Sequence, residues 1–372
     1  MAKFQLVDFA AHFQKGFRNH VVPITEIPAL VRTFGSYGCY ATYFFFSDEI
    51  LTYMSAHTVD STSSIAGYEG KVWAPFFPID LDHPDLVVTL EAARFLVSLL
   101  IDKWMADLNS IQVYFSGSKG FHLMVDTRLF GKVLPSKSLP LILDAMRRHL
   151  AQELPISLRD TVDLGIKDRV RLLRLPNTIH EKSKLYKIII PLQDLKTAEP
   201  ETIRKLAKKP HPLSLTDESG FLSRVPVKEN YDAAAFLKKV RRQAMRIMRK
   251  PFRYRFQRPE DLSHVAFPCA GVQNIWESHV EPGNRNNCAI RLASEFRLLG
   301  LTEQEAGEKL FEWNRTNSIE LPFYELHNIV RSAYQHPFPY RYGCKDDILR
   351  RFCPFPNYTA CRGHVASRTQ KI

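Results

Sequence analysis

Apolar residues follow two different periods along this chain, and the change between them divides it into predicted domains. Over residues 1–227, short apolar runs at 40–46, 111–115 and 186–190 alternate with helical segments such as 90–108. This part of the chain therefore combines elements of strand length with elements of helix length. We therefore predict an α+β domain over this part of the chain.

The last third of the chain has a helical period instead. Apolar residues recur at the spacing of one buried helix face, at Ala289, Leu292, Ala293, Phe296 and Leu299. Thr302 and Glu305 form a capping box, which predicts the start of a further helix that runs to about Arg315. This pattern predicts a second, mostly helical domain over residues 263–372.

The connector between the two predicted domains, residues 228–262, is strongly basic. After Tyr231 it carries ten Lys or Arg residues up to Arg258, and it begins with helical spacing. Pro251 is expected to end this helix and to leave an extended stretch beyond it. Two interpretations remain open. The connector is either a solvated surface helix or a surface that faces nucleic acid. The aromatic residues beyond the proline, Phe252, Tyr254 and Phe256, could stack on bases or anchor the connector onto a domain.

Composition and charge narrow the class of protein. The chain is 45% hydrophobic and 24% charged, as in ordinary globular proteins. Its formal net charge of +12 suits a polyanionic partner, because Lys and Arg side chains that neutralise phosphates release condensed counterions. The N-terminus is interrupted by charge and no run of about 18 apolar residues occurs, so we expect a cytoplasmic, nucleoid-associated protein without a membrane partner.

Two carboxylates end one of the apolar runs. The segment WAPFFPIDLDHP places Asp80 and Asp82 one residue apart. In a strand, residues i and i+2 point to the same face, so these two side chains would converge. Their repulsion would be offset by a divalent cation that prefers hard oxygen ligands, Mg²⁺ or Mn²⁺. The alternative is an ordinary surface loop before the His83-Pro84 turn.

Two further segments carry groups that suit phosphate. The first, SGSKGFH at 116–122, predicts a tight glycine turn between two strands, whose amide groups can cradle phosphate oxygens. A plain hairpin with a lysine at its tip is the alternative. The second, at 161–184, combines Asp163, Arg174 and His180 on a basic strand and the turn after it. A salt-bridged surface strand is the alternative for this segment.

In this order the three segments resemble the catalytic subunit of archaeo-eukaryotic primases and the related primase-polymerases, over roughly residues 40–191. The resemblance implies a catalytic domain with an RRM-like β-sheet core. It implies that Asp80, Asp82 and Asp163 are catalytic and bind two Mg²⁺ or Mn²⁺ ions. It further implies that the incoming nucleotide is bound by Ser116, Gly117, Ser118, Lys119, His122, Arg174 and His180.

The cysteines point to a second site. Six cysteines in a reducing compartment are expected to be thiols or metal ligands rather than disulfides. The C-terminal third resembles the iron–sulphur domain of the large primase subunit, in Pro268-Cys269, a helical middle with Gly283-Asn284-Arg285, and the three cysteines near the end. The resemblance implies a 4Fe–4S cluster, with Zn²⁺ as the alternative, held by Cys269, Cys344, Cys353 and Cys361. His364 could replace one cysteine, and Cys288 is expected to be a buried apolar residue.

Both resemblances occur in one chain, as in the primases of plasmids, viruses and other mobile elements, including some linked to CRISPR loci. The leading hypothesis is a DNA primase that starts a chain from nucleoside triphosphates on single-stranded DNA and extends it. The second is a gap-filling or damage-tolerant polymerase that needs an existing 3′ end. The third is a non-catalytic nucleic-acid-binding initiator or regulatory subunit. A replicative helicase is a further candidate partner.

Overall fold

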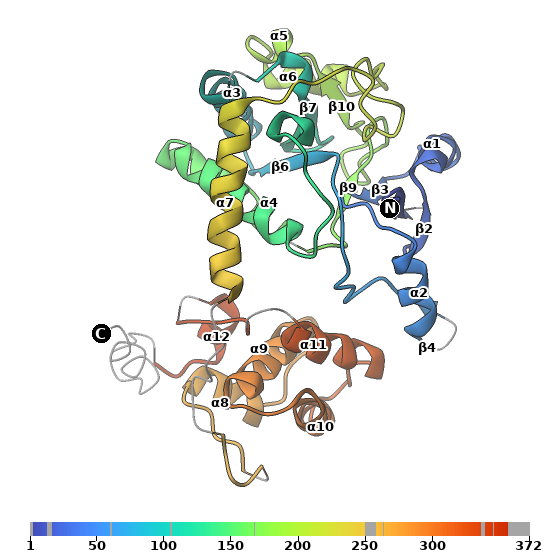
Figure 1. Cartoon of the computed structure of the whole chain (residues 1–372). Coiled ribbons are helices and arrows are strands. Elements are labelled where there is room, and N and C mark those ends of the chain that lie inside the picture. The colour runs from blue at the N-terminus through green and yellow to red at the C-terminus, as the bar shows by residue number, and fades with distance from the viewer. Residues whose placement is uncertain are drawn as a thin grey trace. The chain divides into compact units, whose positions relative to one another are not determined.

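The computed structural model shows two compact units, Met1–Arg249 and Lys250–Ile372, joined in one chain (Figure 1). It describes residues 3–12, 17–59, 62–104, 106–166, 168–249, 258–262, 264–335, 339–344 and 346–355. The fourth predicted cluster cysteine, Cys361, lies outside these residues. So do His364 and the stretch from Pro251 that was predicted to be extended. Each unit is described by itself.

The first unit contains two four-stranded sheets in which every neighbouring pair of strands is antiparallel. The first sheet has the strand order β2 (His20–Pro23), β1 (Leu6–Ala11), β3 (Cys39–Thr42) and β9 (Leu172–Arg174). The second has the order β10 (Ile188–Ile190), β7 (Ile111–Phe115), β8 (Gly120–Asp126) and β6 (Phe76–Asp82). A small hairpin is formed by β4 (Thr58–Val59) and β5 (Thr62–Ser63). The two sheets and their helices confirm the α+β prediction.

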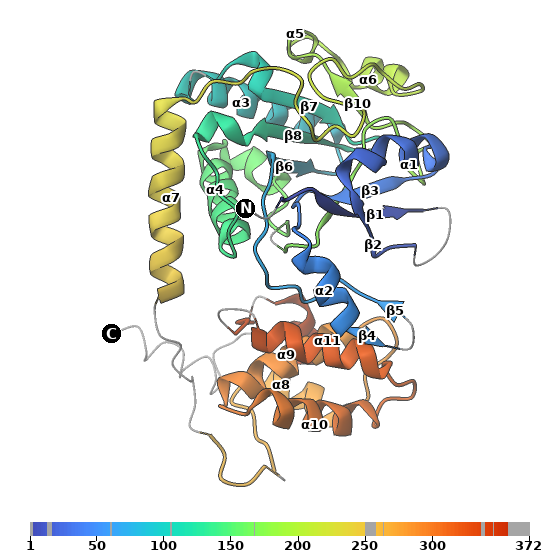
Figure 2. The same cartoon turned by 45° about the vertical axis from the view of Figure 1, so that its right-hand side comes forward.

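Helices flank these sheets (Figure 2). The α-helices of the first unit are α1 (Ile27–Phe34), α2 (Glu49–Ala56), α3 (Leu86–Trp104), α4 (Leu139–Glu153), α5 (Leu192–Leu195), α6 (Pro200–Leu206) and α7 (Tyr231–Arg249). Its 3₁₀ turns are η1 (Ile24–Glu26), η2 (Leu108–Ser110), η3 (Thr127–Phe130) and η4 (Ile156–Thr161). Helix α3 packs against β6 and β8, because its apolar residues are buried along most of its length. Among the described residues, no helix combines the length and apolar composition needed to cross a bilayer.

The pairing of β6 with β8 sets the geometry of the candidate site. The two strands pair along their whole length, from Phe76 opposite Asp126 to Asp82 opposite Gly120. Gly120 is required here, since a Cβ atom at this position would lie 2.1 Å from the Leu81 carbonyl oxygen. Gly117, in the turn between β7 and β8, has a φ of +93°, which side-chain-bearing residues rarely adopt.

The second unit is helical in its described part, as its apolar period predicts. Its helices are α8 (Ala270–Glu277), α9 (Arg285–Leu298), α10 (Glu303–Asn314), α11 (Phe323–Gln335) and α12 (Asp347–Phe352). They enclose a separate core that includes Trp313, whose indole N–H donates to the Ile275 carbonyl oxygen at 2.9 Å. Thr302 and Glu305 form the predicted capping box at the start of α10. Cys288 is fully buried in α9, as expected.

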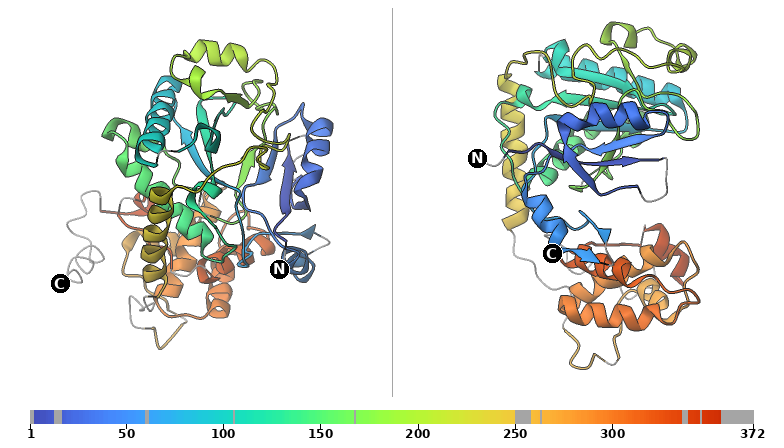
Figure 3. Two further views of the ribbon diagram at one scale, coloured as in Figure 1. Left: turned by 45° about the horizontal axis from the view of Figure 1, so that its top comes forward. Right: turned by 90° about the vertical axis from the view of Figure 1, so that its right-hand side faces the viewer.

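Helix α7 lies within residues 228–262, the predicted connector between two domains. It packs against α3 and α4 and belongs to the first unit (Figure 3). Ala233, Val240 and Ala244 are buried along one stripe of the helix, and the Phe236 ring lies 5.0 Å from the ring of Trp104. This apolar stripe explains why α7 packs against α3 and α4, because a helix with one apolar face gains stability by covering a core.

This packing predicts that Val240→Asp destabilises the first unit. A carboxylate buried without a partner should lower the free energy of unfolding by about 3 kcal/mol or more. The neighbouring substitution Arg241→Asp is the control, because the Arg241 side chain is exposed. Thermal unfolding of both full-length variants checks this. Equal unfolding temperatures of the two variants would show that the helix does not contribute to the core.

Candidate functional site

One cleft of about 310 Å³ in the first unit collects side chains from all three predicted segments. The second sheet contributes the carboxylates of β6, the glycine turn and β8, and the first sheet contributes β3 and β9. The predicted residues that line it are Asp80, Asp82, Ser116, Ser118, Lys119, His122, Arg174 and His180. Segments that are far apart in the chain therefore form one surface. Gly117 shapes the turn without lining the cleft, and its carbonyl oxygen accepts a hydrogen bond from the Ser183 hydroxyl.

Asp163 reaches the same end of β6 by a different route. The chain crosses the free edge of β6, where Leu81 pairs with Val162, and the Asp163 amide donates to the Asp80 carbonyl oxygen at 2.9 Å. Burial, reinforced by the charges of Asp163 and Asp82, raises the pKa of Asp80 to about 7. Asp82 and Asp163 are therefore both close enough to Asp80 to repel its charge.

Each carboxylate faces a basic side chain. Asp82 Oδ2 lies 3.3 Å from Lys119 Nζ, and Asp80 Oδ1 lies 3.6 Å from His122 Nε2. Asp163 accepts a hydrogen bond of 3.0 Å from the Arg171 guanidinium. Among the described residues, no three or more His, Cys, Asp or Glu side chains are grouped so that they would hold a metal ion. Asp82 and Asp163 are therefore each paired with a cation, whereas Asp80 faces an imidazole.

The donor set nevertheless fits a hard divalent cation. It consists of carboxylate oxygens on neighbouring backbone segments, and Asp80 is the most buried of the three. A cation beside Asp80 would offset the repulsion that raises its pKa. His122 supports this view, because its Nδ1 atom is buried and has no hydrogen-bond partner among the described residues. Buried polar atoms without partners are rare in folded proteins and often mark a place where a ligand binds.

The cationic side of the cleft is formed by Lys119, His122, Arg174 and His180. Burial lowers the pKa of His122 well below its usual value, and the charges of Lys187 and Arg174 act in the same direction. Burial and Arg174 also lower the pKa of His180. Both imidazoles are therefore neutral at pH 7 and can donate one N–H to an anion, whereas Lys119 and Arg174 supply positive charge.

Sequence reasoning missed two residues that hold Arg174. Its guanidinium donates to Glu181 Oε2 at 2.8 Å and to the Tyr40 hydroxyl at 2.6 Å, and it lies over the Tyr40 ring at 4.6 Å. Burial acts to raise the pKa of Glu181, but hydrogen bonds from Arg174 and Tyr40 lower it to about 2. Tyr40 could be found only from topology, because it pairs with Arg174 between β3 and β9.

A third missed residue, Lys187, lies behind the cleft. Its side chain is almost wholly buried, Nζ donates to the Arg174 carbonyl oxygen at 2.6 Å, and it lies 4.8 Å from the centre of the Tyr114 ring. Burial lowers its pKa to about 7, although the charge of Asp80 opposes this. Lys187 ties the start of β10 to the end of β9 and places a cation near the carboxylates. In the sequence it resembles any lysine beside a strand.

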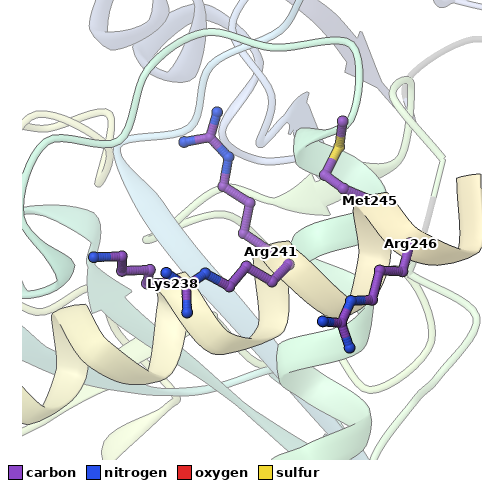
Figure 4. Close-up of a pocket in the computed structure, with 5 residues that line it drawn as sticks. Lys238, Arg241, Met245 and Arg246 are labelled. Carbon is purple, nitrogen blue, oxygen red and sulfur yellow. The ribbon is translucent and has the colours of Figure 1, made fainter. Parts of the chain in front are cut away.

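Helix α7 presents a basic face on the side opposite its apolar stripe. Lys238, Arg241, Arg242 and Arg246 lie at helical spacing on this face together with Met245, and the four basic residues are exposed (Figure 4). We call these four residues the α7 basic face. A solvated surface helix, one of the two interpretations of this basic segment, accounts for the exposed side of α7. It does not account for the apolar stripe on the buried side. A surface that binds nucleic acid remains a prediction.

Two of the predicted cluster cysteines lie at helix ends in the second unit. Cys269 precedes α8 and Cys353 follows α12, and these two helices pack together. A Cβ atom at Gly271 would lie 3.7 Å from the Cys353 Cβ atom. Cys344 precedes α12, and the fourth ligand, Cys361, is outside the described residues. The cluster therefore remains a prediction.

Three arginines of α9 make contacts within the second unit. The structure gives Arg291 a structural role, since its buried guanidinium forms two hydrogen bonds with Asp346, of 2.8 and 2.6 Å. Arg297 donates to the Ala333 carbonyl oxygen at 2.6 Å, and Arg285 donates to the Ile319 carbonyl oxygen. All three hold α9 to neighbouring parts of the second unit.

Comparisons with known proteins agree with part of the predicted resemblance. Residues 277–337, which contain α9, α10 and α11, match the model of the family Primase C terminal 1 (PriCT-1). No curated protein matches the chain in sequence. The C-terminal helices are thus similar to a primase C-terminal domain, and the iron–sulphur assignment remains a prediction.

Two solved structures are similar to the chain at low identity. One is the polymerase domain of Mycobacterium tuberculosis ligase D in complex with DNA, with 13% identity, 63% of this chain and 71% of that chain covered, and a TM-score of 0.31. The other is the primase RepB′, with 9% identity, 98% of this chain and 93% of that chain covered, and a TM-score of 0.30.

Proposed function

We propose that this chain is a DNA primase or primase-polymerase that joins nucleoside triphosphates on a single-stranded DNA template. One observation carries the proposal. Two carboxylates, Asp80 and Asp82, and six of the seven predicted phosphate-binding residues line one cleft of the first unit, and Asp163 is bonded through its backbone to the end of β6. The match of residues 277–337 to a primase C-terminal family supports it from the other unit. A nucleotidyltransferase needs carboxylates for divalent ions next to cations for a triphosphate.

In this proposal Asp80, Asp82 and Asp163 hold two Mg²⁺ or Mn²⁺ ions. When bound, such ions activate the attacking 3′ hydroxyl and stabilise the charge of the leaving pyrophosphate. Lys119 and Arg171 now neutralise two of these carboxylates, so an ion must replace them. Both cations would then be available for phosphate oxygens. The acidic and basic groups of the cleft would exchange partners when substrate binds.

The remaining side chains position the triphosphate. Ser116, Ser118, Lys119 and the backbone of the glycine turn would contact its oxygens from β7 and β8, and Arg174 and His180 would contact them from the other side. Glu181 and Tyr40 hold the Arg174 guanidinium in one orientation before substrate binds, which lowers the cost of ordering it. No covalent protein nucleophile is required, because positioning and charge stabilisation supply the catalysis.

The first test replaces the two acids of β6. Asp80→Asn with Asp82→Asn should reduce nucleotide incorporation at least about 1000-fold, because the ions lose two ligands, while binding of single-stranded DNA stays within about twofold. The control is Asp85→Asn with Asp102→Asn, which removes two acids that do not line the cleft. Synthesis retained by the Asp80/Asp82 variant would remove these residues from the mechanism.

The same assay separates the alternative functions. With template but no primer, a primase forms dinucleotides and longer products, whereas a gap-filling or damage-tolerant polymerase forms none until a 3′ end is supplied. A non-catalytic initiator or regulatory subunit binds DNA and makes no product in either case. Each nucleotide type is supplied with Mg²⁺ and then with Mn²⁺, so that the sugar and the ion are identified together.

We also propose that the α7 basic face binds the backbone of the template. Lys238→Ala, Arg241→Ala and Arg242→Ala together should weaken binding of single-stranded DNA about tenfold or more at low salt. The salt dependence of binding should fall as well, because fewer counterions are released. The control removes three exposed charges from the end of α6 and the residues after it, Arg204→Ala, Lys205→Ala and Lys208→Ala. Equal affinity and salt slope in both variants would show that this face is only solvated.

The C-terminal cysteines remain candidates for a 4Fe–4S cluster or Zn²⁺. Cys344→Ser with Cys353→Ser should remove the bound metal and lower the unfolding temperature of the second unit, because a cluster crosslinks its helices. Elemental analysis and visible absorbance of the purified chain identify the ion. Cys288→Ser is the control, since this buried thiol is not a predicted ligand. A wild-type chain that contains neither iron nor zinc would contradict the assignment.

A further inference from the structure

A second basic pocket of about 500 Å³ adjoins the cleft in the first unit. The two share Tyr40, Arg171 and Leu172 as lining residues, so they meet along β3 and β9. The distal wall of the second pocket contains Arg18, which follows β1 in the chain. None of the residues assigned to the nucleotide by the family resemblance faces this pocket.

Arg18 is held in place from two sides. Its Nε atom donates to Asp8 Oδ2 at 3.3 Å, and its Nη2 atom donates to the Val170 carbonyl oxygen at 2.7 Å. The second bond joins the segment that follows β1 to the segment that precedes β9. The Arg18 side chain is still 43% exposed. A guanidinium fixed in this way can present its remaining N–H groups to a ligand.

Asp8 is an unusual residue for the centre of a strand. It is fully buried in β1, its amide donates to the Thr42 hydroxyl at 3.0 Å, and its Oδ1 atom has no partner among the described residues. Burial raises the pKa of this carboxyl to about 6, although Arg18 opposes the shift. A half-satisfied buried carboxylate destabilises a fold, and an apolar residue at this position would pack without that cost. The carboxyl also has backbone hydrogen bonds with Asn19 and His20, and its side-chain contact is with Arg18, which it orients.

Arg171 faces the same pocket and is held in a similar way. Its guanidinium donates to Asp163 at 3.0 Å, and its side chain is 42% exposed. The acidic residue of the pocket, Asp168, accepts a local hydrogen bond from the Val170 amide at 3.1 Å. Two partly exposed guanidinium groups therefore line one hollow: Arg18 is oriented by Asp8, and Arg171 pairs with Asp163 until an ion takes that carboxylate. Such groups bind phosphate through paired, charge-assisted hydrogen bonds.

We propose that Arg18 and Arg171 form a second phosphate subsite beside the catalytic cleft, which binds a phosphate of the group that supplies the attacking 3′ hydroxyl. This inference rests on the proposed function and extends it, because joining two nucleotides requires a second bound partner next to the first. The phosphate has two sources of the same chemistry, the triphosphate of the first nucleotide or the backbone of an existing strand. Asp8 is a positioning residue for this subsite.

The test uses Arg18→Ala in the full chain, with Arg32→Ala as the matched control. Arg32 is an exposed arginine of α1 that pairs with Glu218 at 2.6 Å and does not line either pocket. Unprimed synthesis and extension of an annealed primer are measured for each variant. If the subsite binds the first nucleotide, unprimed synthesis falls at least about tenfold and extension stays within about twofold. If it binds the strand, both fall, and Arg18→Lys restores part of the loss. Unchanged rates in both assays would overturn the proposal.

Binding separates this proposal from the proposed function. The affinity of the same variants for a nucleoside triphosphate and for a single-stranded oligonucleotide is measured without synthesis. One outcome is that the wild-type chain makes no product, but Arg18→Ala lowers the affinity for either ligand at least about fivefold relative to Arg32→Ala. The proposed function would then fail, and the subsite would stand. Equal affinities of the two variants for both ligands would overturn the subsite.

Asp8→Asn provides a readout that a merely structural role would not give. The pKa of Asp8 is raised on folding, so the native state binds the proton more tightly and stability is lost as pH rises from about 4 through about 6. The amide should therefore raise the unfolding temperature by a few degrees at pH 8 and leave it unchanged at pH 4. At pH 8 the same variant should be several-fold less active in the assay that Arg18→Ala affects, because the guanidinium is less firmly held. A more stable variant with full activity would show that Asp8 does not position Arg18.

Discussion

The register between β6 and β8 is the constraint on which the candidate site depends. It places Asp80 opposite His122 and Asp82 opposite Gly120, so acids and phosphate-binding candidates lie on adjacent strands. The turn that precedes β8 can approach β6 this closely only because Gly120 has no side chain. A shift of one residue would turn every side chain of β6 to the other face and separate the two kinds of group. The neighbouring α3 and the buried apolar residues of both strands hold this register.

Charge is arranged around that register in matched pairs. The acids of the cleft face Lys119, His122 and Arg171, and Arg174 is held by Glu181 and Tyr40. In a partly buried site, an unpaired charge would destabilise the fold. The acidic side chains that suit ions and the basic side chains that suit phosphates therefore neutralise one another before a ligand binds. The second pocket repeats this arrangement with Arg18 and Asp8. Binding at either place exchanges one set of charged partners for another.

The sequence predicted much of the fold and part of the site. The α+β class and the helical second domain follow from apolar periods, which depend only on residue order and on the geometry of helices and strands. The acids of β6, the glycine turn and the basic strand were each found as local motifs. Helix α7 was predicted as a helix, but its place in the first unit was not, because its apolar stripe of Ala233, Val240 and Ala244 gives no indication of which core it covers.

By itself, the sequence determined which residue types occur in each segment and the local geometry that their spacing allows. It could not determine which segments meet, because contacts between residues far apart in the chain depend on strand pairing. Tyr40 and Arg174 are neighbours only through the pairing of β3 with β9, and Arg18 reaches Val170 only because β1 and β9 flank β3 in one sheet. The tertiary structure alone decided these contacts, because burial and charge pairing depend on the distance between residues in space and not on their separation along the chain.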